Sequence, residues 1–133
     1  MIDEQPDNVK TMRQIEIEGS WNVRDLGGYV TEDGRSTRWR VVVRAGNLDK
    51  VTHAGQQTLL DYGIRTVVDL RAPEEVEQYP DVFADSTRVV YRHLPILRNG
   101  YVNGYIPLGE LYTNYLDAYQ AEVGKVITAV AAS

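Results

Sequence analysis

The sequence of 133 residues contains no cysteine. This absence excludes disulfide bonds, thiolate metal sites and catalysis by a thiol of this polypeptide. Histidine is scarce as well: only His53 and His93 are present, and they lack the close spacing that is typical of metal ligands. We therefore predict no metal ion and no cofactor, and we assign no catalytic role to either histidine.

Positively charged residues are fewer than negatively charged ones: the sequence has 14 Lys and Arg residues and 19 Asp and Glu residues, for a net charge of −5. Proteins that bind nucleic acids usually carry a basic surplus, so we predict no nucleic-acid partner. Long apolar runs are absent too, and none approaches the roughly 20 residues of a membrane span. The polar residues 1–14 lack the apolar centre of a signal peptide. The default expectation is a cytoplasmic protein, with secretion by a route without a signal left open.

What is present is ordinary for a globular protein, with 43% hydrophobic and 25% charged residues. The length suits one domain, and a chain of this size can bury a core without disulfides or metal. Residues 1–13 are polar, and we predict a flexible N-terminal arm there. Residues 14–133 are predicted to form the folded domain.

The first part of that domain carries strand signals. Residues 14–18 alternate apolar and polar side chains, which predicts a short half-buried strand. Residues 29–31 and 38–44 are β-prone and flank Asp33-Gly34, a dipeptide typical of tight hairpin turns. The sequence therefore predicts an N-terminal β-hairpin.

Helix and strand signals alternate next. Thr52 is a good N-cap and Gly63 a good C-cap, which predicts a helix between them with Ala54, Leu59 and Leu60 on its buried face. The adjacent valines in residues 65–70 are typical of a parallel strand that is buried on both faces. Three further elements follow, namely a helix that begins at Pro73 and ends near Tyr79, a strand over 88–94, and a loop or lid over 95–107.

Residues 108–132 are predicted to be helical, with a bend or break at Gly124. Their apolar residues recur at spacings of three and four, as on one face of a helix: Leu111, Tyr115, Leu116, Tyr119, Val123, Val126, Ile127 and Val130. The sum is an α/β fold with a mostly parallel sheet, flanking helices and the hairpin. A crossover helix normally leads into a parallel strand. None follows within this chain, so we expect an incomplete domain that lacks its central C-terminal strand and loop.

Asp69 and Arg71 stand at the end of the predicted strand over 65–70. Ligands bind at the carboxyl ends of strands in open α/β sheets. There an Asp can transfer a proton, and an Arg can hold phosphate through two parallel hydrogen bonds. The same pair also fits a purely structural network that caps the next helix, and the residue types alone favour this second interpretation.

Residues 22–28, Asn-Val-Arg-Asp-Leu-Gly-Gly, are typical of a turn. Asn22 and Asp25 can bond to their own backbone, and the paired glycines permit unusual backbone angles. A rigid turn is favoured over a phosphate-binding loop, because no helix begins directly after it. Arg44 ends the hairpin strand and fits an ordinary strand-end salt bridge.

Four runs occur in a fixed order. Residues 22–28 read Asn-x-Arg-Asp-Leu-Gly-Gly, residues 33–35 read Asp-Gly-Arg, and residues 44–48 read Arg-x-Gly-x-Leu. Residues 63–75 read Gly-Ile-Arg-Thr-Val-x-Asp-Leu-Arg-x-x-x-Glu. Together they resemble the microbial protein-tyrosine phosphatases that are grouped with dual-specificity and phosphoinositide phosphatases, and the resemblance extends from about residue 14 to the end of the chain.

The resemblance implies hydrolysis of a phosphorylated protein or another phosphoester through a phosphocysteine intermediate. In that family the nucleophile lies on a loop His-Cys-x-x-Gly-Lys-Asp-Arg after the long helix, and this chain has no such loop. We therefore expect a truncated domain that is inactive by itself. A complementing C-terminal fragment would complete its sheet, and a homodimer with swapped helices would cover the apolar face of the last helix.

The resemblance also implies roles for individual residues. Asp69 is expected to orient the arginine of the catalytic loop or to assist proton transfer. Arg71 is expected near the substrate or in the same network, and residues 97–108 fall where relatives place a lid. Four residues are expected to bind substrate or to support the catalytic loop: Asn22, Arg24, Asp25 and Arg44.

Two alternatives remain. Residues 69–75, with Gly104-Tyr105-Ile106-Pro107 downstream, also resemble rhodanese-like sulfurtransferases, which need a cysteine loop as well. The run over 22–28 favours the phosphatase, because rhodaneses lack it. The second alternative is a complete but non-catalytic phosphatase-like module that binds a partner or a phosphorylated ligand.

Overall fold

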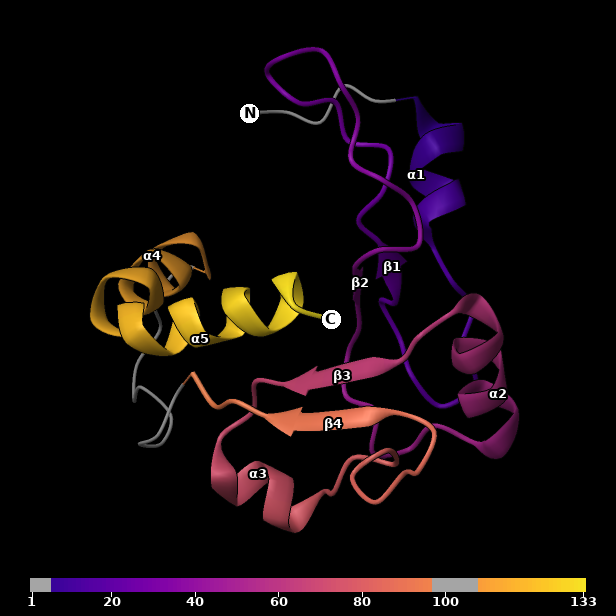
Figure 1. Ribbon diagram of the computed structural model, residues 1–133, viewed down its shortest axis with the longest axis vertical. Helices are drawn as coiled ribbons and strands as arrows, with labels where there is room; N and C mark the ends of the chain where they lie inside the picture. Colours follow the sequence, from indigo (N-terminus) through magenta and orange to yellow (C-terminus); the bar gives the residue numbers. More distant parts are fainter. Residues whose placement is uncertain (1–5, 97–107) are drawn as a thin grey trace. The chain divides into compact units, whose positions relative to one another are not determined.

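The computed structural model describes residues 6–96 and 108–133. The chain divides into two compact units, residues 1–64 and residues 65–133. Helices and strands of both units can be followed by colour in Figure 1. The predicted domain boundary at residue 14 stays a prediction.

Part of the predicted N-terminal arm is helical in the structure. Helix α1 spans Asp7–Arg13, and Arg13 is only 2% exposed. The Arg13 guanidinium donates from Nε to the carbonyl of Gly27 at 2.8 Å and from Nη2 to the carbonyl of Gly28 at 3.1 Å. It also lies 3.6 Å from the centroid of the Tyr29 ring. The arm therefore contains a helix whose last residue is anchored.

Two short strands form the sheet of the first unit. Strand β1 (Arg24–Asp25) pairs antiparallel with strand β2 (Val43–Arg44). The strand predicted over residues 14–18 is reduced to a single bridge between Gln14 and Arg24. Ile17 and Val23 contribute buried side chains beside it.

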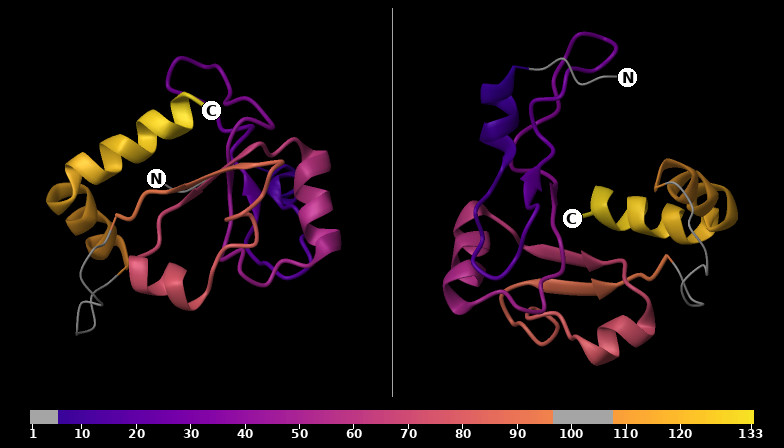
Figure 2. Two further views of the ribbon diagram at one scale, coloured as in Figure 1. Left: turned by 60° about the horizontal axis from the view of Figure 1, so that its bottom comes forward. Right: turned by 180° about the vertical axis from the view of Figure 1, so that it is seen from behind.

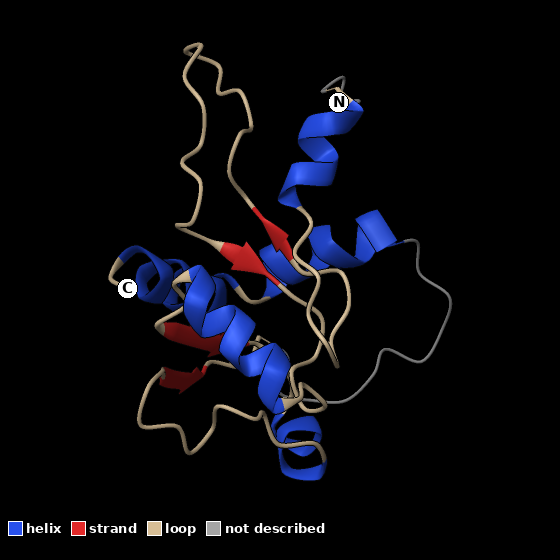
Figure 3. Cartoon of the chain, turned by 90° about the vertical axis from the view of Figure 1, so that its right-hand side faces the viewer, coloured by secondary structure: helices blue, strands red, loops and turns tan. Residues whose placement is uncertain are grey.

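The predicted hairpin is confirmed by its hydrogen bonds. Thr31 donates to Arg35 and Thr37 donates to Tyr29, both at 2.8 Å, and Gly34 takes a φ of 79° in the turn. The β-prone residues 38–44 behave differently, because only the last two form a strand, and that strand pairs with β1. A long loop therefore connects β1 to β2 (Figure 3).

Helix α2 (His53–Tyr62) begins and ends where the sequence predicts. The Thr52 hydroxyl accepts from the Gly55 amide at 3.1 Å, and Gly63 has a φ of 115°. Leu59 and Leu60 are buried, as expected. Ala54 is exposed, which corrects its predicted place on the buried face. Gly55 is buried instead. It packs so closely against the chain that a Cβ there would lie 2.4 Å from the Glu18 carbonyl oxygen.

The second unit is built on a parallel strand pair, as predicted. Strand β3 (Thr66–Asp69) pairs with strand β4 (Val90–His93), and Asp69 is in register with His93. Val67 and Val68 are both only half-buried, so the burial predicted for both faces of the strand is incomplete among the described residues. Helix α3 (Pro73–Gln78) connects the strands and begins at the predicted proline.

The C-terminal segment forms two helices, α4 (Leu108–Ala118) and α5 (Gln120–Ala131), which follow one another in Figure 2. The chain breaks at Tyr119, where φ is −123° and ψ is 40°, and not at Gly124 as predicted. The break changes which side chains share a face. Leu116 and Ile127 are 57% and 63% exposed, so the single buried stripe predicted for both helices is wrong at these residues.

Helix α5 packs along β3 (Figure 1) and buries Ala129. Of the loop or lid predicted over residues 95–107, residues 97–107 lie outside the described residues. In the part of the chain that is described, no helix has both the length and the apolar character needed to cross a bilayer.

Replacing Thr52 by Ala should lower the free energy of unfolding by about 1 kcal/mol, because the Gly55 amide loses its acceptor. Urea unfolding of both proteins measures this loss. Thr58→Ala is the matched control, since Thr58 lies exposed within the same helix. Its change should stay within about 0.5 kcal/mol. Equal losses in the two variants would contradict a capping role for Thr52.

Candidate functional site

Asp69 ends strand β3 and is 6% exposed. Its Oδ1 accepts from the backbone amide of Arg71 at 3.1 Å and from Arg71 Nε at 3.0 Å. Its Oδ2 accepts from Arg71 Nη2 and from the Tyr91 hydroxyl, both at 2.8 Å. A buried carboxylate needs donors of this kind to offset its lost hydration.

Arg71 is brought to Asp69, as the sequence suggested, and its guanidinium is fully engaged. Nε and Nη2 face the carboxylate, and Nη1 donates to the Tyr79 carbonyl at 2.9 Å. The two side chains form an ion pair with 13% and 4% of their side-chain surfaces exposed. In this arrangement Arg71 would have to leave Asp69 before it could grip a phosphate.

Two residues of β4 complete the cluster, and the sequence analysis did not predict their roles. Tyr91 donates to Asp69, and His93 Nε2 donates to the Arg71 carbonyl at 2.8 Å. The signal that could have found them is their spacing, because residues two apart on a strand share one face. Asp69 and His93 are moreover direct neighbours in the parallel register.

The cluster shifts the pKa values of its members. Burial raises the pKa of Asp69, but the hydrogen bonds from Arg71 and Tyr91 outweigh it, and the net pKa is lowered. The hydrogen bond to Asp69 raises the pKa of Arg71, and burial followed by the same carboxylate raises the pKa of Tyr91. Asp69 is therefore held as a carboxylate at neutral pH.

Asp25 is the corresponding buried carboxylate of the first unit, with no exposed surface. Its Oδ1 accepts from the Gly27 amide at 2.7 Å, and its Oδ2 accepts from the Arg40 amide at 2.8 Å and from the Tyr62 hydroxyl. Burial and then the hydrogen bond to Asp25 raise the pKa of Tyr62 to about 12. These contacts tie the turn after β1 to the end of helix α2.

The paired glycines of the turn serve close packing. A Cβ on Gly27 would lie 2.6 Å from Cδ2 of Trp39, and a Cβ on Gly28 would lie 2.6 Å from its Cζ2. Gly28 also has a φ of 76°, which other residues rarely adopt. The run over residues 22–28 is therefore a rigid turn, as its residue types indicate.

The other predicted residues of this unit are exposed. Asn22 has a φ of 54°, and its Oδ1 accepts from Arg24 Nε at 2.9 Å. Arg24 and Arg44 are register partners on β1 and β2. The structure thus brings Asn22, Arg24 and Arg44 together beside the buried Asp25, and it holds Asp69 and Arg71 together in the second unit.

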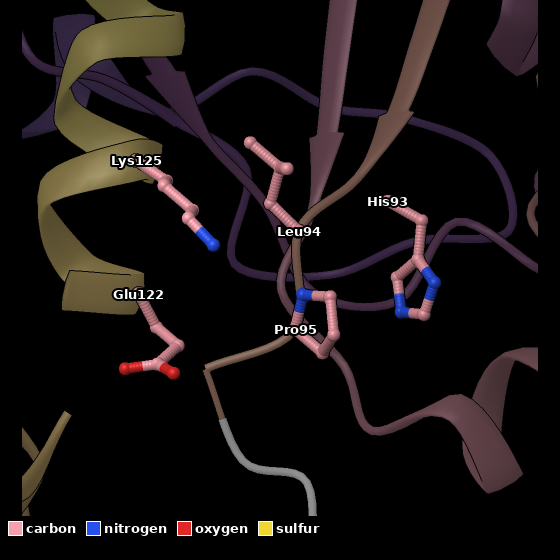
Figure 4. A pocket seen from close by; sticks show the side chains of 5 residues that line it. All are labelled: His93, Leu94, Pro95, Glu122 and Lys125. Carbon is pink, nitrogen blue, oxygen red and sulfur yellow. The ribbon is translucent and has the colours of Figure 1, made fainter.

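A small pocket lies at the end of β4, lined by His93, Leu94, Pro95, Glu122 and Lys125. Figure 4 shows Glu122 and Lys125 extending from α5 toward the residues that follow the strand. Asp69 and Arg71 are not among its lining residues. Across residues 6–96 and 108–133, no three His, Asp or Glu side chains gather as metal ligands would.

Tyr91→Phe should lower the free energy of unfolding at pH 7 by about 1.5–3 kcal/mol, the usual range for a hydrogen bond to a charged group. The lowered folded-state pKa of Asp69 contributes stability above its unfolded pKa of about 3.9, and this contribution is lost as pH falls. The deficit of the variant should therefore shrink between pH 7 and pH 3, as followed by urea unfolding.

Tyr79→Phe is the matched control, because Tyr79 is 48% exposed and its hydroxyl accepts from Gln78. Its cost should be below about 0.5 kcal/mol at both pH values. A Tyr91→Phe deficit that does not change with pH would show that the lost hydroxyl does not act through the charge of Asp69.

Comparison with known proteins adds a family to this geometry. No curated protein matches the chain. The model of the tyrosine phosphatase family matches residues 15–133, which include Asp25, Asp69 and the other predicted site residues. The match agrees with the mixed α/β architecture and its open sheets. On this finding, the chain belongs to the tyrosine phosphatase family.

Proposed function

We propose that this chain carries the supporting residues of a cysteine-dependent tyrosine phosphatase, which hydrolyses phosphomonoesters through a phosphocysteine. The family match over residues 15–133 carries the proposal. The nucleophile has to come from outside these 133 residues, because none of them is a cysteine. The substrate would be a phosphorylated protein or another phosphoester, and dual specificity is part of the same proposal.

Asp69 is proposed as a positioning residue and not as the proton donor. A general acid works best with a pKa near the operating pH. The pKa of Asp69 is lowered by Arg71 and Tyr91, so the group carries no proton to donate at neutral pH. A carboxylate held in this way is suited to orienting an arginine of the catalytic loop.

Arg71 is proposed to belong to the same network and not to contact substrate. All three of its guanidinium nitrogens have partners in Asp69 and Tyr79. Releasing it would leave the buried charge of Asp69 without its main partner, which typically costs several kcal/mol. Of the two roles that the sequence left open for Arg71, the geometry supports this one.

The run over residues 22–28 is proposed to support the catalytic loop through its backbone shape. The buried carboxylate of Asp25 fixes this shape, because it accepts hydrogen bonds from the amides of Gly27 and Arg40. Arg24 on β1 and Arg44 on β2 are exposed, and so is Asn22 just before β1. A cytoplasmic location, a homodimer and a complementing C-terminal fragment stay predictions.

A non-catalytic binding module is the second candidate, and the absence of cysteine favours it. It differs from the first in one measurable respect. The binding module predicts no phosphatase activity in any longer product of the gene, whereas the phosphatase requires it.

The 133-residue chain by itself should release no phosphate from p-nitrophenyl phosphate, because it has no thiol to form the phosphoenzyme. The reading frame beyond the codon for Ser133 should encode a cysteine loop, and a polypeptide that includes this loop should be active. Phosphate release by the purified 133-residue chain would contradict the cysteine mechanism. A frame without a cysteine loop would favour the binding module.

In the active polypeptide, Asp69→Asn should lower kcat by about tenfold to a hundredfold, as expected for the loss of one hydrogen bond between charged groups. Asp85→Asn is the control, since Asp85 is exposed and lies in the same unit. The pH profile separates the two roles of Asp69. A positioning role leaves the shape of the profile unchanged, whereas loss of the alkaline limb in the variant would identify Asp69 as the proton donor.

A further inference from the structure

Arg24 and Arg44 face each other across the two-stranded sheet of the first unit. They are direct register partners of the antiparallel pair β1 and β2. Side chains of such partners lie on the same face, with Cβ atoms about 4.5–5.5 Å apart. The neighbouring residue of β1, Asp25, is buried on the opposite face. The two guanidinium groups therefore extend from one side of a sheet whose other side is fixed in the core.

Both arginines are exposed and available. Arg24 donates from Nε to Asn22 Oδ1 at 2.9 Å, which leaves its two terminal nitrogens without a partner among the described residues. Arg44 has no hydrogen-bond or ion-pair partner in the described part of the chain. Gln14, which bridges to Arg24 on its other side, donates to Glu16. No described carboxylate pairs with either arginine.

This arrangement has a cost in the absence of a ligand. Like charges directly opposite each other destabilise an antiparallel pair. Asn22 orients Arg24 from a left-handed backbone angle, with a φ of 54°, that asparagine tolerates in turns. An anion between the two guanidinium groups would turn the repulsion into attraction.

We infer that Arg24 and Arg44 form a binding site for a phosphate group, with Asn22 as the residue that orients Arg24. Guanidinium groups bind phosphate and carboxylate through paired hydrogen bonds. Two of them side by side favour phosphate, because it carries between one and two negative charges at neutral pH and a carboxylate carries one. The site lies within the first unit and does not depend on phosphatase activity.

Titration calorimetry of the 133-residue chain with inorganic phosphate tests the site at constant ionic strength. A parallel titration with acetate measures the binding of a carboxylate for comparison. Saturable phosphate binding is expected in the wild type. Arg24→Gln and Arg44→Gln should each raise Kd by about tenfold or more, as expected when a charge-assisted hydrogen bond is lost. Arg38→Gln is the matched control, because Arg38 is exposed in the same unit and has no arginine opposite it.

The urea midpoint of unfolding is a second measurement, and it distinguishes a phosphate site from a purely structural role of Arg44. In phosphate-free buffer, Arg44→Gln should unfold at the same urea concentration as the wild type or at a higher one, because repulsion from Arg24 is relieved. Added phosphate should raise the midpoint of the wild type and not that of the variant. A lower midpoint for the variant without phosphate would overturn the proposal, and so would equal Kd values in all four proteins or acetate binding as tight as phosphate binding.

Discussion

A carboxylate can be buried at the end of a strand only if donors replace the water it loses. Asp69 meets this condition with three groups, namely the Arg71 amide, the Arg71 guanidinium and the Tyr91 hydroxyl. The donors come from the loop after β3 and from β4, so satisfying the charge fixes the strand pair and the loop together. Removing a donor would expose the full cost of the buried charge. The geometry of the second unit therefore depends on this one carboxylate, and so does any role that its carboxyl edge has in chemistry.

The first unit solves the same problem with different donors. Asp25 is satisfied by two backbone amides and the Tyr62 hydroxyl, and not by a guanidinium. The guanidinium of Arg40, whose amide donates to Asp25, lies over the Tyr62 ring at 4.5 Å from the centroid. Because backbone amides hold Asp25, the arginines of the adjacent strands are left for other contacts. This difference explains why the guanidinium of Arg71 is bound to a buried carboxylate of its own unit, whereas those of Arg24 and Arg44 are not.

The parts of the fold that the sequence predicts are those whose signals are local. Thr52 and Gly63 mark the ends of α2 by themselves, and the adjacent Val67 and Val68 indicate the parallel strand. The misplaced features depend on distant partners. Helix α1 is anchored because Arg13 reaches the carbonyls of Gly27 and Gly28, which no local pattern reveals. At the site, residue types indicated that Asp69 and Arg71 would interact. The contribution of Tyr91 depended on a strand register that the sequence does not specify.

Arginines of one chain can therefore have opposite effects on its stability, and the groups that each arginine contacts decide which effect it has. An arginine whose donors are all satisfied inside its own unit, such as Arg71, contributes to the scaffold, because a ligand would have to compete with a buried carboxylate for it. An arginine that faces a like charge across a strand pair contributes nothing to stability, and Arg44 is in this position. Selection for folding alone would favour a neutral residue there. The anion that we infer between Arg24 and Arg44 would neutralise a pair of charges that otherwise weakens the strand pair.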